Sequence, residues 1–221
     1  MTPWTKAIPD WFDSLELKQG AHLDRDKGMC VMEAVAYLAG REHSDHPPCV
    51  CPVIGTFLRN WNDNLPDDET RTRLLKPLVP LVIGTKSTPE VEERRSYMAL
   101  DWFVREHVPA WFDLTPRLKP SGDALRALDE INTLAAAKKA GPVVTAAGDA
   151  AGDAARDAAR AAARDAARAA ARDAARAAAG DAAWDAAWDA LQPTTERLQA
   201  SAVELVKRMA AVADRTETEG G

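Results

Sequence analysis

Four side chains of the types that bind zinc lie within nine residues of one another: His43, His46, Cys49 and Cys51, in the segment "HSDHPPCVC". Imidazole and thiolate are the usual ligands of zinc sites. Cys51 also precedes Pro52, a favoured first residue of a helix, where the helix dipole stabilises a thiolate. However, Cys-x-Cys is a less usual clamp than Cys-x2-Cys, and no second, distant pair follows. The segment predicts either a site with zinc as cofactor or a proline-fixed loop with packed thiols and surface imidazoles.

Cys30 suggests a second chemistry, because it follows Gly28 near the start of a predicted helix, where cysteine hydrolases place a nucleophilic thiolate. His43 or His46 would then act as the base, with Asp45 orienting the imidazole. The surrounding segment "GMCVMEAVAYLAG" carries a single charged residue, a glutamate, so the alternative is a buried core cysteine.

The two remaining histidines, His22 and His107, have no other metal ligand or nucleophile close to them in the sequence. We expect them at the surface or at helix ends. The sequence contains no glycine-rich phosphate loop, no paired-carboxylate motif and no Walker-type motif. The sequence therefore indicates no particular reaction, and Cys30 is its single candidate for a catalytic residue.

Composition limits the class of protein and of partner. The 221 residues carry a net charge of -6, with three more acidic than basic residues in each half of the chain, so nucleic acid is not expected as a partner. No apolar stretch approaches the length of a membrane span, and residues 1–12 lack the apolar core of a signal peptide. Three cysteines are too few for a secreted disulfide framework. We expect a cytoplasmic protein that does not bind membranes.

The pattern of apolar residues predicts an all-α fold with a compact helical head, a long alanine-rich helix and short flanking helices. Four helices are predicted in the head, over residues 28–40, 52–63, 66–84 and 90–107. Almost all aromatic residues and every Cys and His precede residue 113, which separates head from tail by composition. The predicted parts are a head over 1–118, a linker and short helix over 119–142, the alanine-rich helix over 143–192, an amphipathic helix over 193–214 and a disordered end over 215–221.

Proline marks two predicted helix ends in the tail. A helix over 122–140 should stop at Gly141-Pro142, and the last helix should begin after Pro193. In this last helix a stripe of apolar residues has a 4-3-4-3 spacing, suited to packing against a neighbour: Leu198, Ala202, Leu205, Met209 and Val212.

Arginine recurs at every fourth position in the alanine-rich segment, from Arg156 to Arg176. Each repeat advances the helix by more than one turn, so the arginine row drifts by about 40° per step and forms no fixed face. Alanine favours a helix strongly, and four i,i+3 pairs add ionic support: Asp153/Arg156, Asp157/Arg160, Asp165/Arg168 and Asp173/Arg176. The segment is predicted to be a rigid spacer, a close alanine interface, or a repeat that expanded by slippage and is tolerated.

Trp184 and Trp188 replace arginine in the same four-residue frame, and Leu191 follows. Two indoles one turn apart expose more apolar area than a free helix tolerates, so these three residues are predicted to mediate an interaction. We expect the last helix to fold back across Gln192-Pro193 and cover them. The head or another chain is the alternative partner surface.

Several phrases of the head are distinctive: "MCVMEAVAYLAG", "SDHPPCVCPVI", "FLRNWND" and "RRSYMALDWFVREHVPAWFDL". Over residues 26–113 they resemble the head of a family of hypothetical proteins from high-GC actinobacteria and their phages, in which alanine-rich repeats often follow. The resemblance implies a bacterial or phage origin and an intracellular location. It implies no reaction and no site residue.

These observations favour a non-enzymatic binding or assembly protein. The head would recognise a partner protein, and the alanine-rich helix would act as a spacer or as an oligomerisation arm. The alternative is a small thiol- or metal-dependent enzyme that uses Cys30, or a metal held by His43, His46, Cys49 and Cys51.

Overall fold

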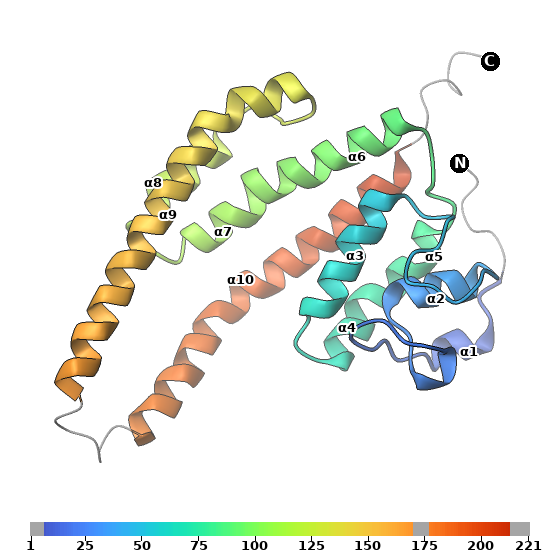
Figure 1. The fold of residues 1–221 in the computed structure, drawn as a ribbon, viewed down its shortest axis with the longest axis horizontal. Coiled ribbons are helices and arrows are strands. Elements are labelled where there is room, and N and C mark those ends of the chain that lie inside the picture. The colour runs from blue at the N-terminus through green and yellow to red at the C-terminus, as the bar shows by residue number, and fades with distance from the viewer. Residues whose placement is uncertain (1–6, 170–176, 213–221) are drawn as a thin grey trace. The chain divides into compact units, whose positions relative to one another are not determined.

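The computed structural model describes residues 7–169 and 177–212, and the side chains of 7–161 and 189–212. Over these residues the chain is helical and contains no strand, so the predicted all-α fold is confirmed (Figure 1). No helix in the described part of the chain is long and apolar enough to cross a membrane.

The chain divides into two compact units. Unit 1 falls within Met1–Met98 and Ser201–Gly221, and unit 2 within Ala99–Ala200. The boundary predicted at residue 118 from composition therefore lies inside unit 2, and the last helix contributes to unit 1. The predicted domain limits rest on changes in residue composition, whereas the two units are defined by contacts between residues. The limits therefore stay a prediction.

Unit 1 contains most of the short helices (Figure 1). It also contains the first part of one longer helix and the last part of another. In chain order these are α1 Asp10–Asp13, the 3-10 turn Arg25–Lys27, α2 Val31–Leu38, α3 Pro52–Asn64, α4 Asp68–Leu75, the 3-10 turn Lys76–Leu78, α5 Val79–Val82 and α6 Pro89–Trp102. The carboxyl end of α10, which spans Ala177–Ala211, also belongs here.

Helix α2 is the centre of the unit 1 core. Seven of its eight residues are buried, as its almost uniformly apolar sequence predicts. The helix begins at Val31, three residues later than expected, because Gly28 has a φ of 127° and Cys30 is extended. Helix α3 packs beside α2 and begins at Pro52 as predicted.

Two buried arginines bind the carboxyl ends of helices. The Arg71 guanidinium donates from Nε to the Asn62 carbonyl at 2.7 Å and from Nη2 to the Leu65 carbonyl at 3.0 Å, at the end of α3. Arg95 in α6 donates from Nε to the Met209 carbonyl at 2.8 Å and from Nη2 to the Val212 carbonyl at 3.1 Å. Helix carboxyl ends present unpaired carbonyls and negative dipole charge, so both cations match their surroundings.

The apolar stripe of the last helix is confirmed. Leu198, Ala202, Leu205 and Met209 are buried, and Val212 is half-buried. The residues from Ser201 onward lie in unit 1, where the Arg95 hydrogen bonds hold the end of α10. The end of α10, from Ser201 onward, therefore shares the unit 1 core with Arg95 of α6.

Both predicted proline stops are wrong. Helix α9 spans Leu134–Ala169 with Pro142 inside it, and α10 continues through Pro193. Each proline removes one backbone hydrogen bond, but the residues four positions earlier, Lys138 and Asp189, are exposed, so water can satisfy their carbonyls. The last helix therefore does not fold back across Gln192-Pro193, and that predicted cover for the two tryptophans is wrong.

Unit 2 begins at the end of α6 and continues through η3 Phe103–His107, a π-helix, α7 Val108–Phe112, α8 Lys119–Arg126 and α9. Gly122 allows α8 to approach α7 closely, because a Cβ there would lie 3.2 Å from the Phe112 Cβ. Leu125 and Ile131 are buried beside this contact region. On the surface, Arg117 pairs with Asp157 of α9 at 2.5 Å.

Replacing Arg95 by methionine should destabilise unit 1 by about 3 kcal/mol, since the buried carbonyls of residues 85 and 209 and the half-buried carbonyl of residue 212 would lose their donor. Urea denaturation followed by circular dichroism measures this loss. The matched control is Arg94→Met, because Arg94 is exposed. Equal midpoints for the two variants would contradict the role assigned to Arg95.

Candidate functional site

A buried carboxylate, Glu33, organises the most polar part of the unit 1 core. Only 1% of the residue is exposed. One oxygen, Oε1, accepts from the His22 backbone N–H at 2.6 Å, and the other, Oε2, accepts from the Cys30 backbone N–H at 2.7 Å. The bond to Cys30 forms half of a capping box at the start of α2, in which the Cys30 sulfur accepts from the Glu33 N–H.

Two histidines from separate loops lie against the same carboxylate. The Nδ1 atom of His22 lies 2.9 Å from Glu33 Oε2. The Nε2 atom of His43 lies 3.0 Å from the His22 carbonyl and 3.5 Å from Glu33 Oε1. His22 was expected at the surface or a helix end, and its ring is instead largely covered. The cluster comprises Glu33, His22, His43 and Cys30.

The carboxylate fixes which nitrogen of His22 carries a proton toward it, as in the acid–imidazole pairs of many enzymes. The remaining nitrogen, Nε2, does not face an open space. It lies against Gly28, where a Cβ would come within 3.0 Å of both Nε2 and Cδ2 of the ring. This contact and the φ of 127° together require glycine at position 28. The arrangement clamps the loops before and after α2 onto that helix.

The surroundings of Cys30 do not suit a nucleophile. The residue is 3% exposed, and burial raises the pKa of its thiol to about 12. A thiolate is the reactive form of cysteine, and burial in apolar surroundings disfavours it. Asp45 and His46, the suggested orienter and base, do pair at 2.6 Å. Their hydrogen bond lies in an exposed loop, whereas the polar partner of Cys30 is Glu33.

The four predicted zinc ligands have different partners. Cys51 is fully buried, and its backbone N–H donates to Thr85 Oγ1 at 3.1 Å. Cys49 is half-buried, His46 pairs with Asp45, and His43 bonds to the His22 carbonyl. Within residues 7–161 and 189–212, no three His, Cys, Asp or Glu side chains form a group that could hold a metal ion. The packed thiol of Cys51 fits the predicted proline-fixed loop, and the zinc site stays a prediction.

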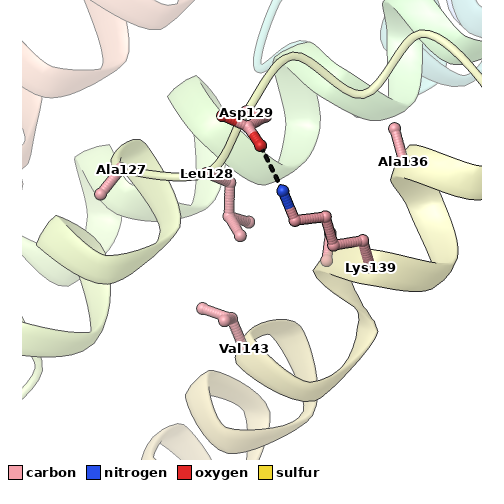
Figure 2. Close-up of a pocket in the computed structure, with 7 residues that line it drawn as sticks. Ala127, Leu128, Asp129, Ala136, Lys139 and Val143 are labelled. Carbon is pink, nitrogen blue, oxygen red and sulfur yellow. Dashed lines mark hydrogen bonds and ion pairs between the residues drawn. The ribbon is translucent and has the colours of Figure 1, made fainter.

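A hollow of about 300 Å³ lies in unit 2, between the segment after α8 and the first turns of α9 (Figure 2). Its polar groups are Asp129 and Lys139, which form an ion pair at 2.7 Å, and both side chains are more than three-quarters exposed. The remaining lining is apolar: Ala127, Leu128, Ala136, Ala140 and Val143. None of the residues predicted to carry chemistry lines this hollow.

The predicted interaction residues lie in α10. The side chains of Trp184 and Trp188 fall outside the described residues, so their contacts stay a prediction. Leu191 is 36% exposed.

Comparison with known proteins found no matching family model, no matching curated protein and no matching solved structure.

Replacing Glu33 by glutamine should cost about 2–3 kcal/mol of unfolding free energy. The substitution keeps the side-chain volume but replaces one of the two acceptor oxygens by an N–H donor, which would then face the backbone donor of either His22 or Cys30. Urea denaturation provides the measurement, and Glu42→Gln, at an exposed position, is the control. If both variants unfold at the wild-type midpoint, the carboxylate does not clamp the loops.

Alkylation should modify Cys49 first in the folded chain, and Cys30 and Cys51 only after unfolding in urea. Cys49 is half-buried, whereas the other two thiols are covered and that of Cys30 has a pKa of about 12. Iodoacetamide labelling followed by peptide mass spectrometry gives the order. Faster labelling of Cys30 than of Cys49 in the native protein would restore the nucleophile hypothesis.

Proposed function

We propose that this chain is a non-enzymatic binding or assembly protein. Its N-terminal head recognises a partner protein, and its alanine-rich helix acts as a spacer or oligomerisation arm. The resemblance of the head to proteins of actinobacteria and their phages supports a cytoplasmic role in such a cell.

The observation that carries this proposal is the exposure of the repeat region of α9. Every residue from 155 to 161 is exposed, alanines and charged residues alike. A helix in a core buries at least one stripe of side chains, and this segment buries none. Such a helix separates what lies at its two ends.

Ion pairs along the helix support its stability in water. Asp153 bonds to Arg156 at 2.5 Å and Asp157 to Arg160 at 3.4 Å, so these two predicted i,i+3 pairs are confirmed. The pairs predicted at 165/168 and 173/176 lie outside the described side chains. Each exposed pair contributes roughly 0.2–0.5 kcal/mol, and alanine supplies the rest of the helix preference.

The chemistry of the head favours binding over catalysis. The covered thiol of Cys30 and the dispersed partners of His43, His46, Cys49 and Cys51 weaken the two enzyme hypotheses. Contact through the tail is assigned to Trp184, Trp188 and Leu191, because this end of the repeat replaces arginine with large apolar side chains.

Replacing both Trp184 and Trp188 by alanine should abolish concentration-dependent association of the full chain, because the indoles supply most of the apolar area of that helix end. Sedimentation velocity over a dilution series measures this association. The control deletes residues 164–167, one four-residue repeat, which keeps the frame and should leave association unchanged.

Circular dichroism of each variant confirms that the helices still form. A wild-type chain that stays monomeric at every concentration would contradict the oligomerisation arm and leave the spacer. Loss of association in the repeat deletion, but not in the double tryptophan variant, would place the contact in the repeat instead.

A further inference from the structure

His107 occupies an unusual position in unit 2, at the end of the π-helix η3. A π-helix is wider than an α-helix, and such turns occur often at functional positions. Here it connects α6 directly to α7, so the side chains of this turn govern how α7 leaves the longer helix. From its place in the sequence, His107 is predicted only as a surface or helix-end histidine.

Three aromatic rings contact the half-buried His107 imidazole, and one of them, Phe103, is 50% exposed. The Phe103 ring stacks on it, with centroids 5.4 Å apart and planes 17° from parallel. The Trp102 ring lies tilted at 5.0 Å, and the Trp111 ring lies edge-on at 6.2 Å. These contacts come from α6, η3 and α7, so the imidazole links three successive helical segments.

The hydrogen bonds of the ring define its protonation. The indole Nε1–H of Trp111 points at His107 Nε2 at 3.2 Å. An indole N–H can only donate, so Nε2 must be an unprotonated acceptor, and the proton of the neutral ring is on Nδ1. Nδ1 is buried and has no hydrogen-bond partner in the described structure. The packing therefore requires the neutral imidazole.

We propose that η3 and α7 form an acid-sensitive latch, held closed by the Trp111–His107 hydrogen bond and released when His107 takes up a proton. The proton adds to Nε2 through the lone pair that accepts the indole N–H. Two donors would then face each other, and the charged, half-buried ring would carry two N–H groups without an acceptor, one more than the neutral ring. Opening of α7 relieves both penalties.

Burial also lowers the pKa of His107 from its ordinary value. The folded latch consequently binds a proton less readily than the open form does. The contribution of neutral His107 to the stability of the closed latch is fully present above about 6.5, the pKa of the imidazole in the unfolded chain. This contribution is lost as the pH falls from there through the lowered pKa of His107 in the folded chain. The latch is closed at neutral pH and opens under acid conditions.

Other charged groups of the packed elements have partners of their own. Arg105 donates from Nη1 to Asp101 at 3.1 Å, and Glu106 is on the same π turn. Helix α7 contains no charged residue. On α8, Arg126 pairs with Asp113 and Asp123, and Lys119 lies 3.7 Å from Asp123.

Opening of the latch would affect the packing at the start of α9. Helix α7 packs on both η3 and α8, and α8 in turn packs on α9. The close approach of Gly122 to Phe112 and Pro109 depends on the position of α7. Acid release would therefore loosen the support of α9, whether or not the helix has the binding role proposed above.

The test follows the Trp111 indole N–H resonance of the ¹⁵N-labelled full chain as the pH is lowered. We expect it to shift with a midpoint below 6.5, and the Trp111→Phe variant assigns the resonance by its loss. In that variant the ring carbons of His107 should titrate at a higher pH than in the wild type, because no donor opposes protonation of Nε2.

Hydrogen exchange of the same protein tests the opening itself. After correction for the intrinsic pH dependence, amides of residues 108–126 should lose protection by up to about tenfold per pH unit below 6.5, while those of α2 keep theirs. His107→Phe retains an aromatic ring but cannot titrate, so its protection should not change with pH. An indole midpoint at or above 6.5, or pH-independent protection in the wild type, would overturn the proposal.

Discussion

The buried guanidinium of Arg95 is the constraint on which unit 1 depends. A fully buried cation is costly unless its donors are satisfied, and here carbonyls of Met209, Val212 and Thr85 satisfy them. Because Met209 is 114 positions away in the chain, the terminal helix has to return to the head for this core to close.

Apolar periodicity predicted the parts of this fold that depend on burial alone. The core position of α2 and the buried stripe from Leu198 to Met209 follow from the apolar pattern, and the start of α3 at Pro52 follows from the preference of proline for the first turn of a helix. The continuation of α9 through Pro142 and of α10 through Pro193 could not be predicted in this way. A proline costs one hydrogen bond and some strain, and whether the helix continues depends on exposure of the preceding carbonyls and on the contacts that hold both sides.

The polar cluster shows a different limit of sequence reasoning. Closeness in the chain suggested that His43, His46, Cys49 and Cys51 act together, whereas the fold groups His43 with Glu33 and His22. A signal for Glu33 was present, since a single carboxylate in an otherwise apolar helix needs buried donors, and its spacing from Cys30 is that of a capping box. The two loops place His22 and His43 beside Glu33. This placement depends on the backbone of Gly28 and on tertiary packing, which the sequence pattern does not reveal.

The repeat and the latch place different physical demands on one chain. A helix whose charged residues drift around its axis presents no fixed apolar face for packing. Its orientation must then come from what holds its base, and in unit 2 that base is α8, packed through Gly122 on α7. Since α7 is joined to η3 by the bond between Trp111 and His107, a single neutral imidazole supports the element from which the exposed helix extends. In the proposed function, specific contact is assigned to the tryptophan-containing end, where the four-residue frame continues with apolar side chains in place of arginine.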